Sequence, residues 1–394
     1  MNNCALCIVH CAFFRIFASV IIGYDAKRIV RNATGLGNYG RTLVNDIVNC
    51  QDVDLHLYAP DKGRENLQSQ ILPGVNWHFA RTNPGLYAAP TPLWRTWGIV
   101  SDLKRDGIQL YHGLSGELPI GIRKSGIKSV VTIHDLIFLR HPEYYHWLDT
   151  KIYAWKFRHI IHEADHIIAI SECTKRDIIA FGGVDDHRIS VIYQSCAPRF
   201  TQRVGNDVQS GYTPLLPLCV KRYILSVGSI EERKNILLAV KALHYLPEDL
   251  GLVIVGRHTK YTDKVEAYVQ QNGLSERVRI LHGITDDQLP ALYAQAEAFV
   301  YPSRYEGFGI PVIEAIGCGL PVVACTGSCL EEAGGPDSLY VSPDDAEGMA
   351  AAISRVIRGA EGREQRVCRS REYIRRFEGS DVAGQVVDLY RNLL

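Results

Sequence analysis

The stretch Tyr301-Pro-Ser-Arg-Tyr-Glu-Gly-Phe-Gly-Ile-Pro-Val-Ile-Glu-Ala315 joins an apolar run to a glycine-rich loop and a helix start. The apolar residues 298–301 are typical of a buried strand, and Pro311 suits the first position of a helix. The loop glycines leave backbone N–H groups uncovered where a helix N-terminus already attracts anions. The segment therefore predicts a ligand site at a strand-to-helix turn of a parallel α/β protein.

Two glutamates of this segment, Glu306 in the loop and Glu314 in the first turn or so of the helix, have seven residues between them. This spacing lets both carboxylates face one cleft. Acceptors for sugar hydroxyls would then lie beside backbone donors for phosphate, which favours a nucleotide-sugar site. The alternative is an ordinary strand-to-helix turn with two solvated glutamates, and the matching parts found elsewhere in the chain argue against it.

The length and composition of the chain limit its class. A chain of 394 residues is too long for one ordinary core, which favours two domains. Its 46% hydrophobic and 22% charged residues are typical of a soluble globular enzyme. The 43 basic and 43 acidic residues cancel, which removes the electrostatic case for nucleic acid as the main partner. The 11 cysteines, an odd number in apolar segments, indicate reduced thiols and a cytoplasmic protein.

The first residues form an apolar run that resembles a signal or anchor, but charged and polar residues interrupt it and no cleavage site is clear. Residues 1–18 are therefore predicted to be an N-terminal extension without fixed structure. Cys4, Cys7 and Cys11 are spaced closely enough for a metal site. No second Cys/His pair at zinc spacing follows them, so neither a metal nor a cofactor is expected.

Short apolar runs alternate with amphipathic segments along most of the chain, which predicts strands and helices in βα order. The first set of predicted strands is Val20–Tyr24, Leu55–Tyr58, Leu110–His112, Ser129–Ile133, His166–Ile170 and Ser190–Ile192. The helices predicted among them are Gly37–Asn49, Leu93–Asp106, Thr150–Glu163 and Thr174–Ala180. The pattern stops in a stretch rich in Pro, Gly, Ser and Gln at 194–220. It restarts with predicted strands at Tyr223–Val227, Gly251–Val255, Val278–His282, Ala298–Tyr301, Pro321–Ala324 and Leu339–Val341. Two doubly wound parallel sheets are therefore expected.

Five motifs in a fixed order resemble those of the retaining glycosyltransferases of family 4, which have the GT-B fold. The motifs are Gly35-Leu-Gly-Asn-Tyr-Gly40, Thr132-Ile-His-Asp-Leu136, Ile170-Ser-Glu-Cys-Thr174, Ser226-Val-Gly-Ser229 with Arg233-Lys-Asn235, and Glu306-Gly-Phe-Gly309 through Glu314. The resemblance covers nearly the whole chain and implies two Rossmann-like domains that face each other across a cleft. The implied divisions are an acceptor-side domain at 19–200, a linker at 201–220, a nucleotide-sugar-binding domain at 221–378 and a helix at 379–394 that packs back on the first domain.

Arg233 and Lys234 lie in the turn after a predicted strand, and Asn235 is a candidate N-cap of the helix that follows. Cations have the wrong sign for the positive end of a helix dipole, so an anion held there would explain them. The pair predicts a diphosphate clamp that also neutralises the leaving nucleoside diphosphate. The alternative is an exposed basic pair at a helix start.

The resemblance implies roles for the residues around this clamp. Glu314 would hold the ribose hydroxyls, Glu306 would contact the transferred sugar, and the base would lie near Ile284. The implied donor-binding residues are Gly37, Gly228, Ile284, Gly307, Phe308, Gly309 and Glu314, with backbone N–H groups serving at Gly37, Phe308 and Gly309. The implied catalytic residues are His134, Arg233, Lys234 and Glu306.

His134 follows an apolar strand at its carboxyl end, where an imidazole can hydrogen-bond a sugar hydroxyl or the reacting oxygens. Asp135 is expected to orient or polarise it. The alternative is a capping or buried histidine. The aromatic run His141–Trp147 is interpreted either as an acceptor platform or as ordinary helix packing.

Three other motifs favour different functions and are rejected. Gly35–Gly40 fits the G-x-G-x-x-G pattern of NAD-dependent oxidoreductases, but it lies well after its strand, and no acidic residue ends the second strand. His162-Glu-Ala-Asp-His166 matches a zinc-protease motif, but its second histidine begins a predicted strand. Asp52-Val-Asp54 matches a metal motif of other glycosyltransferases and is interpreted as a solvated turn.

No carboxylate in these motifs is an obvious covalent nucleophile of the kind that retaining glycosidases use. The resemblance implies front-face departure and attack without a metal, in which the leaving diphosphate accepts the proton of the acceptor. The motifs are most similar to those of bacterial mannosyl- and rhamnosyltransferases of surface polysaccharide synthesis. This favours GDP-mannose over UDP- or dTDP-hexoses as the donor, and a glycan or lipid-linked saccharide as the acceptor. A sugar-nucleotide-binding protein without transfer activity is the alternative.

Two basic groups are candidates for peripheral contact with the inner face of a membrane. One is the arginine cluster at 371–376, and the other is a set of cations interleaved with aromatic residues at 151–158. A solvated helix face above a buried aromatic stripe is the alternative explanation for the second group.

Overall fold

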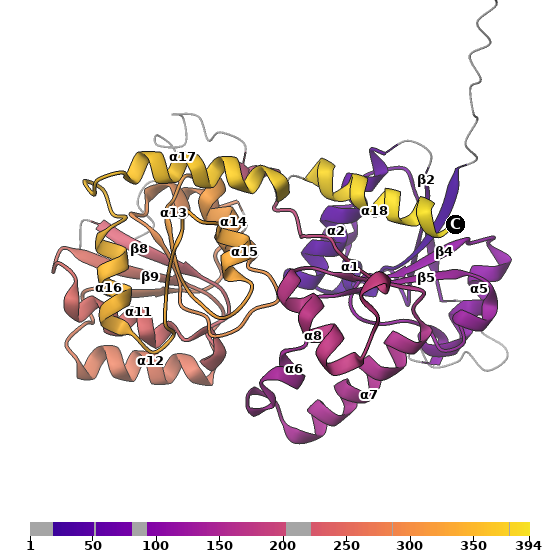
Figure 1. The fold of residues 1–394 in the computed structure, drawn as a ribbon, viewed down its shortest axis with the longest axis horizontal. Coiled ribbons are helices and arrows are strands. Elements are labelled where there is room, and N and C mark those ends of the chain that lie inside the picture. The colour runs from indigo at the N-terminus through magenta and orange to yellow at the C-terminus, as the bar shows by residue number, and fades with distance from the viewer. Residues whose placement is uncertain (1–18, 51–52, 81–92, 202–221, 286, 378) are drawn as a thin grey trace, which may run out of the picture.

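The computed structural model describes residues 19–50, 53–80, 93–201, 222–285, 287–377 and 379–394 (Figure 1). The predicted N-terminal extension with its three cysteines lies outside these residues, as does nearly all of the predicted linker. Two α/β halves lie side by side, and each contains one parallel sheet.

The first sheet has seven strands, and every neighbouring pair is parallel. In spatial order they are β3 (Val75–Phe79), β2 (Val53–Ala59), β1 (Val20–Asp25), β4 (Leu110–Gly113), β5 (Lys128–Ile133), β6 (His166–Ala169) and β7 (Ile189–Val191). The helices of this half are α1 (Lys27–Arg31), α2 (Gly35–Val48), α3 (Glu65–Gln68), the π-helical turn η1 (Trp94–Gly98), α5 (Ile99–Arg105), α6 (Ile137–Arg140), α7 (Trp147–Glu163) and α8 (Glu172–Gly182). Short 3₁₀ turns occur at η2 (Arg123–Ser125), η3 (Pro142–Tyr144) and η4 (Asp186–Arg188).

The second sheet has six strands with the same winding. In spatial order they are β10 (Val278–Leu281), β9 (Leu250–Val255), β8 (Arg222–Val227), β11 (Phe299–Tyr301), β12 (Val322–Cys325) and β13 (Leu339–Val341). Its helices are α11 (Ile236–Ala242), α12 (Lys260–Gln271), α13 (Leu289–Gln295), α14 (Ile310–Gly317), α15 (Leu330–Gly334), α16 (Ala346–Ser354) and α17 (Arg363–Ile374). The remaining elements are α9 (Pro198–Thr201), the turns η5 (Glu232–Lys234), η6 (Leu243–Tyr245) and η7 (Arg375–Phe377), and the last helix α18 (Gly379–Leu393).

Helices cover both faces of each sheet, so the strands are buried on both sides. In β1, Ile22 and Tyr24 pack in the core that α2 and α18 cover. The preceding residue, Ile21, packs on the opposite core, with residues of α5 and α7. Alternation along one strand therefore supplies two separate hydrophobic layers.

The last helix runs back from the second half to the first (Figure 1). Tyr390 of α18 is buried, and its hydroxyl lies 2.7 Å from the hydroxyl of Tyr24 and 2.5 Å from Nδ1 of His112. The chain end is thus fixed to the middle of the first sheet by hydrogen bonds as well as by apolar contact. Phe200, before the linker, packs in the core of the second sheet. The exact domain limits remain predictions.

The predicted architecture of two doubly wound parallel sheets is confirmed. Strand β3 was not predicted, and α14 begins one residue before Pro311, so Glu314 lies in its second turn. The predicted helix at 93–106 begins with a π-helical turn before α5.

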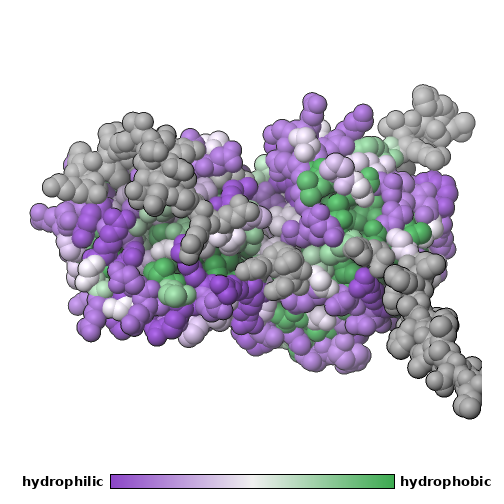
Figure 2. All heavy atoms as spheres, turned by 90° about the horizontal axis from the view of Figure 1, so that it is seen from above, coloured by the Kyte–Doolittle hydropathy of each residue, from purple (hydrophilic) through white to green (hydrophobic). Residues whose placement is uncertain are grey.

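Hydrophilic residues cover most of both halves in the view of Figure 2, and hydrophobic groups show in smaller patches. Among the residues that the structure describes, no helix is both long enough and apolar enough to cross a membrane.

Candidate active site between the two sheets

The carboxyl ends of the strands in the two halves meet at one place. His134 follows β5 of the first sheet, and the loop 302–309 follows β11 of the second. The halves approach so closely that a Cβ on Gly307 would lie 2.0 Å from the carbonyl oxygen of His134. Glycine is therefore required at 307 by the contact between the halves, and the predicted site residues at 134 and 306–309 are brought together.

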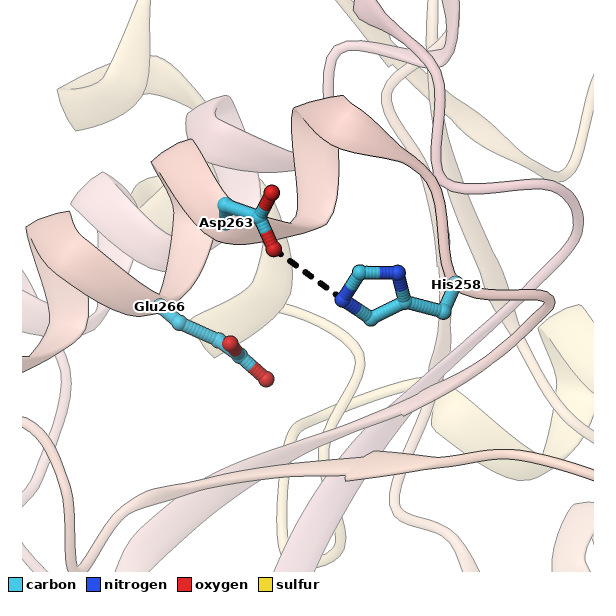
Figure 3. A group of neighbouring side chains, drawn as sticks. All are labelled: His258, Asp263 and Glu266. Carbon is cyan, nitrogen blue, oxygen red and sulfur yellow. Dashed lines mark ion pairs between the residues drawn. The ribbon is translucent and has the colours of Figure 1, made fainter.

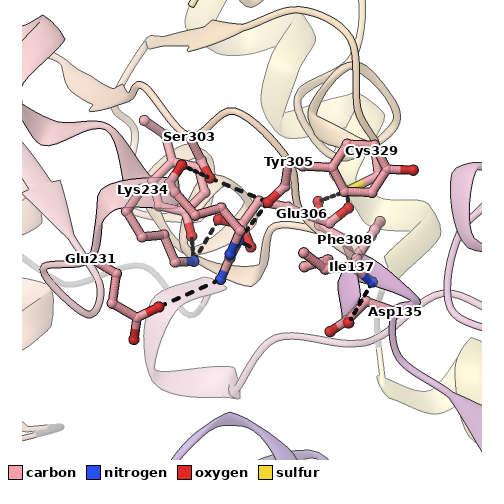
Figure 4. Close-up of polar contacts among 12 residues, drawn as sticks. Asp135, Ile137, Glu231, Lys234, Ser303, Tyr305, Glu306, Phe308 and Cys329 are labelled. Carbon is pink, nitrogen blue, oxygen red and sulfur yellow. Dashed lines mark hydrogen bonds and ion pairs between the residues drawn. The ribbon is translucent and has the colours of Figure 1, made fainter. Parts of the chain in front are cut away.

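Arg233 and Lys234 lie in turn η5, directly after β8, and both contact Glu306 (Figure 4). Arg233 Nη1 lies 3.0 Å from Glu306 Oε2, and Lys234 Nζ lies 2.5 Å from Glu306 Oε1. Lys234 also donates to the hydroxyl of Tyr301, at 2.7 Å. Two cations thus share the carboxylate of Glu306, and Arg233 also lies 3.9 Å from the carboxylate of Glu231.

The charges of this cluster support one another. Burial opposes ionisation of Glu306, but Lys234 and Arg233 outweigh it and lower the pKa of Glu306 to about 2. Burial is the largest single influence and would lower the pKa of Lys234, but the attractions of Glu306 and Tyr301 together exceed it and raise the pKa. All three side chains are therefore charged at neutral pH, and an anionic ligand would meet two cations already held in place.

Asn235 occupies the N-cap position of α11, as predicted, but it does not cap the helix with its side chain. Its backbone is left-handed, with φ 55°, and its amide donates to the carbonyl of Pro343 at 2.8 Å. The side chain therefore ties the turn of the cations to a neighbouring loop instead of to the helix end.

Three successive carbonyls fix the orientation of the glycine-rich loop before α14. Cys329 Sγ lies 3.1 Å from the carbonyl oxygen of Glu306 and 2.7 Å from that of Phe308 (Figure 4). The carbonyl of Gly307 accepts a hydrogen bond from Ser171 Oγ at 2.7 Å. Because N–H and C=O point in opposite directions in a trans peptide, these contacts turn the following N–H groups away from Cys329 and Ser171.

The first turn of α14 has no side-chain cap, since its N-cap residue is Gly309 with φ 127°. Within the described part of the chain, no hydrogen bond uses the backbone N–H of Phe308, Gly309 or Ile310 as its donor. These N–H groups and the positive end of the helix dipole form an anion-binding arrangement. The side chain of Phe308 itself is buried in the core.

The other predicted donor-binding residues occupy separate places around the second sheet. Glu314 Oε2 accepts a hydrogen bond from the hydroxyl of Tyr293 at 3.1 Å. Gly228 has φ 150° and lies against the ring of Tyr301, which in turn contacts Lys234. Ile284 packs on the apolar core of the second half, and no contact joins it to Glu306 among the described residues.

Gly37 lies inside α2, where a Cβ would come within 1.8 Å of the carbonyl oxygen of Asn32. Its N–H, to which the sequence assigned a phosphate, already donates to the carbonyl of Thr34 at 2.9 Å. The glycine is thus required for close packing of α2 on the preceding loop.

His134 lies half-buried where the two halves meet and has two polar neighbours. Its Nε2 lies 2.8 Å from the carbonyl oxygen of Leu114, so this nitrogen carries the proton, and its Nδ1 lies 2.9 Å from Nε2 of Gln194. Burial lowers the pKa of His134 to about 4, so the ring is neutral at physiological pH. Asp135, which was expected to orient it, instead accepts a hydrogen bond from the N–H of Ile137. Leu114 and Gln194 orient the imidazole.

Sequence reasoning missed several residues that join the halves. Tyr305 donates to Asp177 at 2.7 Å, and the Glu332 carboxylate accepts from the N–H groups of Glu172 and Cys173 at 2.7 and 2.9 Å. Tyr305 and Cys173 lie in motifs that are recognisable in the sequence, but their partners Asp177 and Glu332 lie inside helices of the opposite half, so these contacts depend on how the halves dock.

The rejected motifs are placed as expected where they are described. His162 lies in α7 and His166 in β6, so they share no helix face. A different group, His258, Asp263 and Glu266, has ligand atoms within 4.8 Å of one another at the start of α12 (Figure 3). All three are exposed, and such surface groups are common without an ion.

Comparisons with known proteins agree with this geometry. Residues 33–195 match the family model described as Glycosyltransferase Family 4, and residues 220–373 match Glycosyl transferases group 1. O-antigen chain mannosyltransferase B of Escherichia coli is 28% identical over 91% of this chain and 96% of that protein. O-antigen chain mannosyltransferase RfbU of Salmonella typhimurium is 28% identical over 63% of this chain and 65% of that protein.

Solved structures show the same fold. Sucrose-phosphate synthase from Thermosynechococcus elongatus is 22% identical, with a TM-score of 0.77 over 95% of this chain and 99% of that one. Anabaena HepE in complex with UDP is 16% identical, with a TM-score of 0.74 over 95% of this chain and 100% of that one. The fold, with two parallel-sheet halves and a candidate site between them, is that of a GT-B glycosyltransferase. The chain belongs to glycosyltransferase family 4 and is a hexosyltransferase that uses a nucleotide-sugar donor and a saccharide acceptor.

Proposed function

We propose that the protein transfers a mannosyl group from GDP-mannose to a glycan or lipid-linked saccharide, with retention of configuration. The observation that carries the proposal is the pairing of two fixed cations with unsatisfied N–H groups at the start of α14. This is the combination that a sugar diphosphate needs. The mannosyltransferase names of the two relatives support mannose as the sugar.

The proposed roles follow from the contacts of the site. Arg233 and Lys234 bind the diphosphate and neutralise the charge that develops on it as the sugar leaves. Glu306 contacts the transferred sugar, and Glu314 binds the ribose hydroxyls. Both cations now contact Glu306, so a bound diphosphate competes with this carboxylate for their N–H groups.

His134 is proposed to contact the transferred sugar without acting as the base. Its ring is neutral, and both ring nitrogens are engaged by Leu114 and Gln194. The leaving diphosphate is the group left to accept the proton of the acceptor hydroxyl, with attack on the face from which it departs. The protein then contributes positioning and the exclusion of water.

The experiment is a thermal-shift series with GDP, UDP, dTDP and NAD, followed by assay of mannose release from GDP-mannose. We expect GDP to stabilise the protein more than the other nucleotides. A ligand that binds only the folded state raises the melting temperature, and the rise is larger for the ligand that binds more tightly. Stabilisation by UDP or dTDP alone would replace the donor. A response to NAD alone, with no release of mannose, would contradict the proposal.

We further propose that α7 rests on an anionic membrane surface. Its side chains Trp147 and Trp155 are 62% and 61% exposed, Lys151 lies between them along the helix, and Lys156 follows Trp155. Exposed tryptophan beside lysine is typical of interfacial helices. The arginine cluster at 371–376 is less suited, because Arg371 and Arg376 contact a backbone carbonyl and aromatic rings of the protein.

Sedimentation with phosphatidylcholine vesicles, with and without phosphatidylglycerol, tests whether α7 binds an anionic membrane surface. Loss of anionic-vesicle binding in Trp147→Ala/Trp155→Ala is expected, and equal binding by the variant would contradict it.

A further inference from the structure

A pocket of about 490 Å³ lies entirely in the first half, away from the cations of η5. It is bounded by the carboxyl ends of β1 and β4, by η1, by the loop 117–120 and by α7. No residue that lines it belongs to the second sheet. The pocket is therefore separate from the proposed diphosphate site, although both open at strand ends.

Both acids of the pocket pair with one arginine. Arg95 makes ion pairs with both Asp25 and Glu117. Asp25 is 4% exposed and accepts from Arg95 through two nitrogens. These two carboxylates therefore hold Arg95, whose single positive charge leaves the three groups with one excess negative charge.

The remaining charged groups of the pocket are cations. Lys27 and Lys156 line it, and neither makes an ion pair with any residue that the structure describes. Burial lowers the pKa of Lys27, and the nearby positive charges of Arg95 and Arg28 lower it further. An anion in the pocket would relieve both effects.

His159 adds a polar atom that lacks a partner. Its Nε2 is buried, and it makes no hydrogen bond within the described residues. The ring stacks on Trp155 at an interplanar angle of 13°, so it is held in one orientation beside the pocket. A buried nitrogen without a partner costs stability unless a ligand or water satisfies it.

A short loop connects the pocket to the candidate active site. The carbonyl of Leu114 holds His134, and three residues later Glu117 begins the pocket lining. The donor diphosphate would be bound by the second half, so an additional cationic site in the first half suits an anionic second substrate. Its aromatic wall also continues into the exposed face of α7.

We propose that this pocket binds the phosphate group of a phosphorylated acceptor, through Lys27, Lys156 and His159. The inference rests on the proposed function and specifies its acceptor: a saccharide joined to a phosphate or diphosphate. The same chemistry is presented by a lipid-linked saccharide and by a water-soluble sugar phosphate.

The test measures binding of inorganic pyrophosphate by calorimetry in the Arg233→Met/Lys234→Met background, where the other cationic site is removed. This makes the result independent of whether GDP-mannose is the donor. Adding Lys27→Gln/Lys156→Gln should weaken binding about tenfold or more, because charge-assisted hydrogen bonds are lost. Lys151→Gln is the matched control, since Lys151 lies on the same helix but packs over Trp147 outside the pocket.

Equal affinity for pyrophosphate with and without Lys27 and Lys156 would overturn the proposal. A failure of pyrophosphate to bind while both lysines are present would also overturn it. Lys156→Gln alone is a second variant, because Lys156 is exposed and its replacement leaves the core intact. Vesicles of phosphatidylcholine with phosphatidic acid identify the source of the phosphate. Vesicle binding that falls with the pocket lysines indicates a lipid-borne phosphate, and loss of pyrophosphate binding alone indicates a soluble one.

Discussion

Helices α8 and α14 begin on opposite sides of the same contact, and their first turns are treated differently. In α8, Ser171 caps the N–H of Thr174, and Glu332 from the other half accepts from the N–H groups of Glu172 and Cys173. In α14, Gly309 provides no side-chain cap, and no acceptor for the first N–H groups is present among the described residues. The end supplied with a carboxylate serves to join the halves, whereas the uncapped end lies beside two cations.

The difference between the first turns of α8 and α14 distinguishes a structural contact from a binding site. Both helix starts attract anions through their dipoles and N–H groups. The first turn of α8 is occupied by Glu332 of the protein itself, and this contact joins the two halves. The first turn of α14 follows Gly309, which provides no side-chain cap, so its N–H groups are available to a ligand. The predictions below test whether the two ends behave so.

The largest effect is expected where the cations face α14. Replacement of Arg233 or Lys234 by methionine should reduce kcat about 10²–10³-fold, because charge on the leaving diphosphate loses a fixed partner. Steady-state assay with GDP-mannose measures it, and circular dichroism checks folding. A rate within about threefold of wild type would remove the cations from the mechanism.

The next effect concerns the approach of the halves. Gly307→Ala should lower kcat/KM about 10–100-fold, because its Cβ would collide with the carbonyl of His134 and displace the loop before α14. Gly384→Ala is the control, since a Cβ there meets nothing within 4 Å. If both variants lose activity equally, the collision does not explain the loss.

The protonation of His134 provides a test through pH. Its pKa is about 4 in the folded protein, whereas an unfolded histidine titrates near pH 6.5. The unfolded state therefore binds more protons between these values, so stability falls as pH drops from about 6.5 to about 4. In urea unfolding, the free energy of unfolding of His134→Gln should fall less steeply with decreasing pH than that of the wild type, by about 1 kcal/mol per pH unit. If the free energy of unfolding falls equally steeply with decreasing pH in the two proteins, the neutral state of the His134 ring is contradicted.

The filled helix end should matter for stability more than for the donor. Glu332→Gln removes the charge on the first turn of α8 and should lower the free energy of unfolding by about 1 kcal/mol. The Kd for GDP should stay within about threefold, because the α14 end is untouched. A large loss of GDP affinity without a change in stability would reverse the roles of the two helices.

The smallest effect is expected at Cys329, whose thiol is a weak donor to two loop carbonyls. Cys329→Ala should reduce kcat/KM about threefold as the loop before α14 loosens. Cys329→Ser keeps a donor and should retain more activity than alanine. Equal losses in both variants would indicate a packing effect alone.

The sequence predicted the architecture well because periodicity marks buried parallel strands directly. It also predicted that Glu306, Arg233 and Lys234 lie together, since each follows a strand where ligand sites form, and the structure brings the three side chains into contact. It placed Gly37 at a phosphate, although the structure uses that glycine for packing, and it paired His134 with its neighbour in sequence. Gln194 and Glu332 were not predicted, because their partners are distant in the chain; Glu332 also meets its partners only after the halves dock.

The most direct test is a crystal structure of the protein with GDP bound. We expect the diphosphate to lie between Arg233 and Lys234 and to accept hydrogen bonds from the N–H groups of Phe308 and Gly309. Glu332 should remain on the first turn of α8. A diphosphate bound elsewhere, with the first turn of α14 still without a partner, would contradict the distinction between the two helix ends.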